Sequence, residues 1–168
     1  SAGHTSGRII SEGEETIQLA IQSRQSSISI QIWKEYTDQI EISIINPSGV
    51  RVGPVPEILG PHRFRIGQTE ILLYYGEPSP YSISQEIYID LLPVESYLTE
   101  GIWRIVLSAG KIVTGQYEMW LPSDNVLNRG TGFLFPTDAT TLTIPSSASR
   151  AISVGAYDAR TFAYADFS

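Results

Sequence analysis

Ile28-Ser29-Ile30-Gln31-Ile32 is followed, after seven residues, by Ile40-Glu41-Ile42-Ser43-Ile44. In both stretches isoleucine alternates with a polar residue. Because successive side chains of a β-strand point to opposite faces, this alternation predicts strands with one buried face and one polar face. The same period of two recurs at residues 17–21, 64–66, 87–91, 103–107 and 117–121, and residues 71–75 form a continuous apolar run.

The segments between these stretches contain Gly, Pro, Asn, Asp and Ser, the residues that form turns. They lie at residues 46–49, 60–61, 76–80, 108–111 and 122–125. No segment shows the period of an amphipathic helix, and only residues 96–101 are compatible with one short helical turn. Long connections at residues 47–61 and 122–140 favour Greek-key crossings over a meander. The sequence therefore predicts an all-β fold, an antiparallel β-sandwich, with a jelly roll preferred over an immunoglobulin-like arrangement.

Composition excludes several classes of function. The chain of 168 residues has a net charge of -7 and no cysteine. Binding to nucleic acid or to anionic membranes needs clustered Lys and Arg, and the one basic cluster, His62-Arg63-Phe64-Arg65, is short. Disulfides and Cys-ligated metals are excluded, and no apolar run reaches the roughly 20 residues of a membrane-spanning helix. We therefore expect no nucleic-acid partner, no membrane span and no cofactor.

A different pattern follows residue 140. Thr141-Leu142-Thr143-Ile144-Pro145 precedes Ala151-Ile152-Ser153-Val154-Gly155-Ala156, and the sequence continues to Phe167-Ser168. This is a Pro-containing loop, then a short apolar strand, then a Gly that lets another backbone approach closely. The segment resembles the part of the subtilisin-like serine proteases (subtilases, family S8) that lies between the oxyanion-hole Asn and the nucleophilic Ser.

The resemblance implies a chain in three parts. Residues 1–11 would be an N-terminal flank from the subtilase core, residues 12–136 a β-sandwich insertion, and residues 137–168 the return segment of the catalytic core. The fold would then be a jelly-roll-like β-sandwich with a C-terminal segment from a subtilisin α/β core. This order resembles that of the clostridial spore-germination (Csp-type) proteases, whose catalytic core is interrupted by a jelly roll.

No catalytic residue is expected in this chain. Subtilases place the catalytic Asp, His and Ser and the oxyanion-hole Asn in conserved motifs, none of which occurs here. His4 reads as a flexible loop residue and His62 as a turn residue. By position, the resemblance implies that Thr143 and Ile144 lie near the floor of the pocket for the substrate side chain.

No metal site is assigned. Asp124, Asn125 and Asp138 carry oxygen ligands of the kind that calcium prefers, but lone Asp and Asn in Pro-rich turns usually form the turn itself. A calcium site in the parent protease remains open, and none is predicted within this chain.

The expected partners follow from the same resemblance. They are the remainder of the subtilase catalytic core and, for the parent enzyme, a protein substrate. The strand at Ala151–Ala156 would lack its neighbours, so we expect it to fray, to fold onto the β domain or to pair with a second copy of the chain. A secreted, cell-envelope or spore-associated location is favoured over the cytosol.

Two functions remain open. One is a non-catalytic insertion domain that packs on the protease core or modulates access to it. The other is a stand-alone module that binds carbohydrate or a cell surface. Trp33 and Trp120 occupy the positions that alternate with the apolar residues of their strands, so their side chains should lie on the outer face of the sheet. There they would either stack on a sugar or be covered by the protease core.

Overall fold

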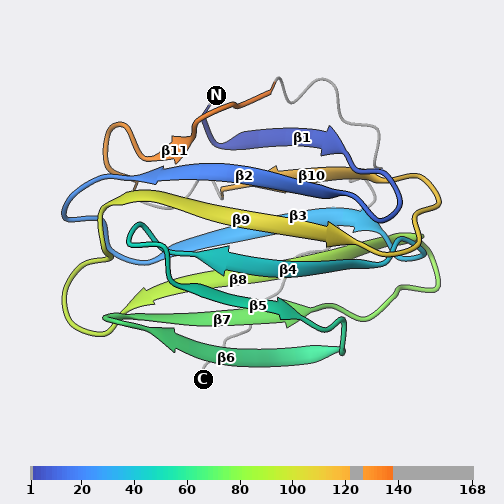
Figure 1. Ribbon diagram of the computed structural model, residues 1–168, viewed down its shortest axis with the longest axis horizontal. Helices are drawn as coiled ribbons and strands as arrows, with labels where there is room; N and C mark the ends of the chain where they lie inside the picture. The colour runs from blue at the N-terminus through green and yellow to red at the C-terminus, as the bar shows by residue number, and fades with distance from the viewer. Residues whose placement is uncertain (1, 122–126, 138–168) are drawn as a thin grey trace.

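The computed structural model describes residues 2–121 and 127–137, which form two antiparallel sheets packed face to face (Figure 1). The six-stranded sheet has the order β1-β10-β3-β8-β7-β6, and the five-stranded sheet has the order β11-β2-β9-β4-β5. The strands are β1 (His4–Arg8), β2 (Glu14–Ile21), β3 (Ile28–Glu35), β4 (Ile40–Ile45), β5 (Arg51–Val55), β6 (Gly60–Ile66), β7 (Thr69–Tyr75), β8 (Ser84–Pro93), β9 (Gly101–Ala109), β10 (Gln116–Trp120) and β11 (Gly132–Phe133). Helices are absent from this described part of the chain.

The order of the strands is that of a jelly roll. Early and late strands pair in a nested series: β1 with β10, β2 with β9, and β3 with β8. The pairs alternate between the two sheets, as they do when one long antiparallel ribbon is rolled up on itself. A β6–β7 hairpin extends the larger sheet beyond β8, and β11 extends the smaller one beyond β2. The predicted all-β, jelly-roll sandwich is confirmed.

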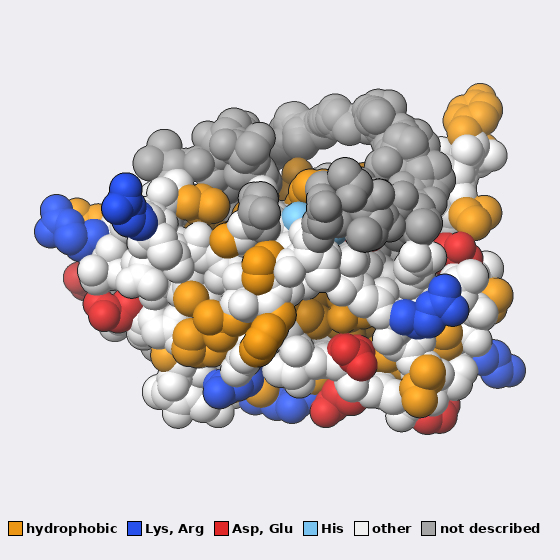
Figure 2. Space-filling model, turned by 90° about the horizontal axis from the view of Figure 1, so that it is seen from above, with side chains coloured by type: hydrophobic (Ala, Val, Ile, Leu, Met, Phe, Trp, Pro, Cys, Tyr) orange, Lys and Arg blue, Asp and Glu red, His pale blue; other side chains and the backbone are white. Residues whose placement is uncertain are grey.

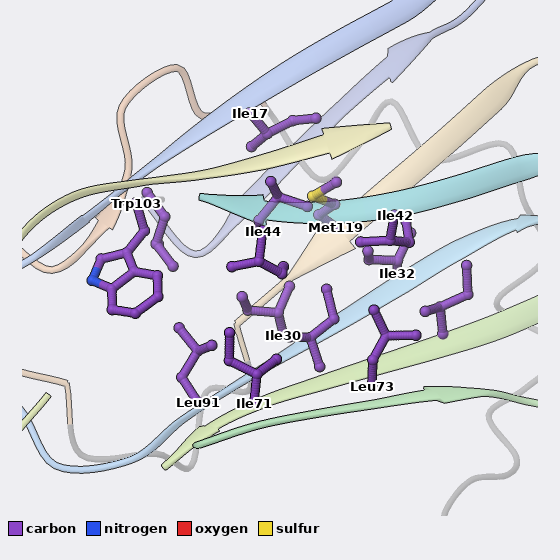
Figure 3. Close-up of a cluster of buried hydrophobic side chains, with 14 of the residues drawn as sticks. Ile17, Ile30, Ile32, Ile42, Ile44, Ile71, Leu73, Leu91, Trp103 and Met119 are labelled. Carbon is purple, nitrogen blue, oxygen red and sulfur yellow. The ribbon is translucent and has the colours of Figure 1, made fainter. Parts of the chain in front are cut away.

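The core lies between the sheets and consists of the alternating apolar positions that the sequence predicts. Figure 3 shows Ile30, Ile32, Leu73 and Ile42, which come from both sheets and meet in this layer. Each isoleucine or leucine side chain that is fully buried contributes about 1.5–3 kcal/mol to folding. Trp103 is the largest buried side chain, and its Nε1 donates a hydrogen bond to the carbonyl of Thr99 at 2.9 Å.

Three strands were not predicted. β5 contains Gly53 and Pro54, which read as turn residues, yet it is an edge strand, where Pro is tolerated because one side of the strand needs no donor. β1 and β11 lack apolar alternation, and both are edge strands defined by their pairing with a neighbour. The short helical turn considered for residues 96–101 does not form, because residues 94–97 bend and Gly101 already begins β9.

Residues 4–8 belong to the sandwich, although the sequence assigned them to a flank. β1 pairs along its full length with β10. The origin of residues 1–11 in a protease core, and the boundaries at 12 and 137, stay predictions. No helix long and apolar enough to cross a membrane is found within residues 2–121 and 127–137.

Candidate functional site

Several of the residues singled out in the sequence lie outside the described part of the structure. These are the proposed pocket residues Thr143 and Ile144, the strand Ala151–Ala156, and the possible oxygen ligands Asp124, Asn125 and Asp138. In the ranges that are described, no three His, Asp or Glu side chains come together as a metal site would require. His62 lies in β6 rather than in a turn, and its ring packs edge-on against Tyr75.

The outer face of the six-stranded sheet carries Trp33 and Trp120, two of the three tryptophans. The strand register aligns His4, Trp120, Gln31, Tyr88 and Tyr74 in one row that crosses five strands. Trp120 and Trp33 are both half-buried. Both side chains lie on the same face of the sheet, as their positions in the alternating pattern predict, and neither is fully exposed.

Acidic groups lie between these aromatic side chains. Glu118 faces Trp33 across the strands, and Glu86 faces Trp33 from the other side. Gln31 Nε2 donates a hydrogen bond to Glu86. Burial raises the pKa of Glu86, and the hydrogen bond from Gln31 offsets part of this rise. The face therefore carries aromatic side chains, and the carboxylates between them, buried in Glu118 and half-buried in Glu86, are bound to His4 and Gln31.

The first and last described segments, residues 2–6 and 133–137, lie together at one edge of the sandwich. We call it the joining edge. Phe133 N donates to the carbonyl of Ala2 at 2.8 Å, and Thr137 N donates to the carbonyl of His4 at 2.9 Å. Thr5 Oγ1 donates to the carbonyl of Phe135 at 2.8 Å. In Figure 1 the two segments lie side by side along the top of the molecule. The first and last described segments of the chain thus lie side by side.

His4 ties the joining edge to the sheet. Its Nε2 lies 2.7 Å from Glu118 Oε1, and its Nδ1 lies 3.1 Å from the carbonyl oxygen of Thr137. Both ring nitrogens of His4 are therefore engaged by neighbouring groups. The ring also packs on Trp120, with centroids 4.1 Å apart. The prediction that His4 is a flexible loop residue is wrong: the side chain is buried in β1.

Thr137, His4 and Glu118 do not form a catalytic triad. Thr137 Oγ1 lies 3.3 Å from Nδ1, which gives a hydroxyl, an imidazole and a carboxylate in series. However, the Thr137 carbonyl oxygen is closer to Nδ1, and His4 and Glu118 are each only 1% exposed. A nucleophile needs a substrate-accessible hydroxyl bonded to a free base nitrogen. The arrangement holds residue 137 against β1 and β10.

A second candidate site lies at one end of the sandwich, on the right in Figure 1. We call it the loop end. It is formed by the loops at residues 9–13, 36–39, 56–59, 76–83 and 110–115. Backbone hydrogen bonds connect neighbouring loops. Glu12 N donates to the carbonyl of Gly110 at 3.0 Å, and Tyr36 N donates to the carbonyl of Ile83 at 2.6 Å. The loops therefore form one connected layer.

Asp38 organises the loop at residues 110–115. Its buried carboxylate accepts hydrogen bonds from the N–H groups of residues 113–115 at 2.6, 3.1 and 2.8 Å, and from Thr114 Oγ1 at 3.2 Å. Burial by itself works to raise the pKa of Asp38, but these hydrogen bonds outweigh it and hold the pKa below its usual range. Gly115 has a φ of 83°, and a Cβ there would lie 2.0 Å from the carbonyl oxygen of Ile9.

Lys34 supports the same end from inside the core. Its Nζ donates to the carbonyls of Asp38 at 2.7 Å and Glu35 at 3.1 Å, and it lies 3.1 Å from Glu57 Oε2. Burial lowers the pKa of Lys34, and the neighbouring carboxylates of Glu57 and Asp38 offset part of this. The sequence analysis missed this residue. The available signal was that Lys34 continues the inward positions occupied by three isoleucines, 28, 30 and 32.

Exposed apolar side chains gather on this layer. Of the large hydrophobic side chains that are exposed in the described residues, seven lie in the loops of this end: Ile10, Tyr36, Ile58, Leu59, Tyr81, Ile83 and Val113. The opposite end has three, Val50, Val94 and Tyr97. Figure 2 shows hydrophobic side chains standing out from the right-hand end of the molecule. Sequence periodicity cannot detect this patch, because its members come from separate loops.

The comparisons with known proteins differ in outcome. No protein-family model matches the sequence, and no curated protein matches it. Among solved structures, the fold is similar to the Clostridium perfringens CspB protease, with a TM-score of 0.73 and 28% sequence identity. The match covers 81% of this chain and 28% of that one. The chain thus spans little more than a quarter of the length of the CspB protease.

Proposed function

We propose that this chain is a non-catalytic jelly-roll domain of a subtilisin-like serine protease, inserted into the catalytic part. The similarity to part of the CspB protease carries the proposal, because it combines a TM-score of 0.73 with 28% identity over most of the chain. The subtilase-like pattern after residue 140 supports it independently of the fold.

The joining edge also supports insertion. A domain inserted into another must receive and return the chain at nearby points, and termini that lie close together are what makes insertion tolerable. Here Thr137 is hydrogen-bonded to His4, and Phe133 to Ala2. A host domain would need only a small opening to accommodate both connections.

The role of such a domain is structural. Its partner is the remainder of the catalytic part, against which it packs, and by packing it restricts access to the cleft or makes the enzyme more rigid. The described residues contain no arrangement of nucleophile, base and oxyanion donors, so the protein substrate would be cleaved elsewhere in the longer protein.

A serine-reactive fluorophosphonate probe tests the proposal. The longer protein encoded by the same reading frame should be labelled at one serine outside residues 1–168, and replacing that serine with Ala should abolish both labelling and peptide hydrolysis. The 168-residue chain should not be labelled. A longer protein that is folded and neither labelled nor proteolytic would contradict the proposal.

The outer face of the six-stranded sheet supports a second candidate function, the binding of carbohydrate. Trp120, Tyr88 and Tyr74 lie in one cross-strand row, an arrangement of aromatic rings suited to the apolar faces of a sugar. Binding of soluble oligosaccharides to the 168-residue chain, lost in Trp120→Ala with folding retained, would favour this alternative. Absence of binding would leave the protease domain as the remaining function.

A further inference from the structure

The loop end has the properties of an interaction surface. Tyr81 is 94% exposed, Ile10 72%, Val113 68% and Ile83 62%. Single exposed apolar residues are ordinary on protein surfaces, but a concentration of them in one region marks a site of interaction. We call Ile10, Tyr36, Ile58, Tyr81, Ile83 and Val113 the loop-end patch.

The layer beneath the patch is rigidly built. Two loops that carry patch residues are anchored to the same buried carboxylate, since Asp38 lies in the loop of Tyr36 and binds the N–H groups of residues 113–115. Lys34 and Glu57 fix the neighbouring loop that carries Ile58. Desolvating two charged groups is costly, and hydrogen bonds to every nearby loop offset the cost only if those loops stay in place. The part of the patch that carries Tyr36, Ile58 and Val113 is therefore preorganised, which lowers the entropy lost on binding.

The charges around the patch restrict the partner. The described loops of this end expose Glu12 and Glu77, while Glu57 is paired with Lys34. Lys111 is the basic residue of these loops, and Arg8 directly precedes loop 9–13. A second copy would bring the same acidic groups into contact, and an anionic membrane would repel them. A protein surface that is apolar and flanked by Lys or Arg fits both features.

We propose that the loop-end patch docks on an apolar surface with a basic rim in the catalytic part of the longer protein. The inference rests on the proposed function, which supplies that partner. The loop end is within reach, because β1 runs from the joining edge to loop 9–13 in five residues, or about 15 Å. Residues 2 and 3 lie at the far end of β1, beside Phe133 and Leu121, and Thr137 lies beside its middle, with its Oγ1 2.9 Å from Ser6 Oγ. A host domain attached along this edge therefore has at most the length of β1 to span to reach the loop end.

Two matched triple variants test the docking. The loop-end variant carries Tyr81→Ser, Ile83→Ser and Val113→Ser. The control carries Tyr97→Ser, Val94→Ser and Val50→Ser at the opposite end. Because binding stabilises a folded domain, the jelly roll should unfold at a higher temperature in the longer protein than in the 168-residue chain. The loop-end variant should lose this difference and the control should keep it. Both variants of the 168-residue chain should retain the wild-type Tm.

The outcomes separate the docking from the proposed function. Equal behaviour of the two variants in a longer protein that is labelled by the fluorophosphonate probe would overturn the docking and leave the function intact. Concentration-dependent dimerisation of the 168-residue chain, abolished by the loop-end variant, would identify a second copy as the occupant and overturn it too. Binding of the chain to phosphatidylcholine vesicles that is lost in the loop-end variant would identify a lipid surface as the occupant and would also overturn the docking.

Discussion

The two ends of the sandwich are closed by different chemistry. At the loop end, the buried charges of Lys34 and Asp38 hold the loops. At the opposite end, which comprises residues 22–27, 46–50, 67–68, 94–100 and 127–131, neutral amides do this work. Gln25 accepts a hydrogen bond from Asn128 N at 2.7 Å, and Asn46 accepts one from Val50 N at 2.8 Å.

The two ends also differ in how far their exposed aromatic side chains are covered. At the opposite end Tyr97 is partly covered by Arg24, whose guanidinium carbon lies 5.3 Å from the ring centroid. At the loop end Tyr81 is nearly fully exposed. Amide caps are sufficient to close a jelly roll. The costlier charged framework therefore occurs where apolar side chains must be presented in fixed positions.

The largest expected effect comes from removing the lysine. Lys34→Ala takes the lysine donor from the buried carbonyl of Asp38 and the ion-pair partner from Glu57, which keeps only the longer hydrogen bond from Ile40 N at 3.3 Å. The free energy of unfolding should therefore fall by about 3–5 kcal/mol. Gln25→Ala at the opposite end should cost about 1–3 kcal/mol, since only neutral groups lose their partner. Urea unfolding measures both. Lys34→Met, which keeps the buried stem, should recover only part of the loss. Full recovery would show that the charge does not hold the loops.

Removing the carboxylate should have the next largest effect and should depend on pH. Asp38→Ala removes the acceptor for residues 113–115 and should cost about 2–3 kcal/mol at pH 7. The folded-state pKa of Asp38 is lowered, so its contribution is complete above the unfolded pKa of about 4 and is lost as the pH falls through the folded pKa. The difference between wild type and variant in urea unfolding should therefore shrink below about pH 4. A difference that stays constant down to pH 2 would contradict this.

The neutral cap at the opposite end should matter less. Asn46→Ala removes acceptors for Val50 N and Ser48 Oγ and should cost about 1 kcal/mol. Because an amide does not titrate, the cost should be the same at pH 3 and pH 7. Thermal unfolding at the two pH values measures it, and a pH-dependent cost would remove the distinction between the ends.

The smallest effect concerns the patch itself. In the 168-residue chain, Tyr81→Ser together with Ile83→Ser should change the free energy of unfolding by less than about 0.5 kcal/mol for each substitution, since both side chains are exposed. Urea unfolding measures the change. A substantially larger loss would mean that these side chains stabilise the domain and are not reserved for a partner.

The sandwich could be predicted from sequence because isoleucine alternation reports directly on a buried strand face. The strands from Ile28, Ile40 and Trp103 follow this rule. β1 and β5 could not be found, because edge strands are defined by a neighbour rather than by apolar side chains. The Lys34–Asp38 framework depends on residue 38 meeting residues 113–115, a long-range contact that no local pattern encodes.

Amide hydrogen exchange, compared between the 168-residue chain and the longer protein, tests the account most directly. We expect protection to increase in the longer protein at loops 9–13, 76–83 and 110–115 and to stay unchanged at loops 46–50 and 94–100. Equal protection of both ends in the two proteins, or an increase confined to the opposite end, would contradict the assignment of the loop end as the docking surface.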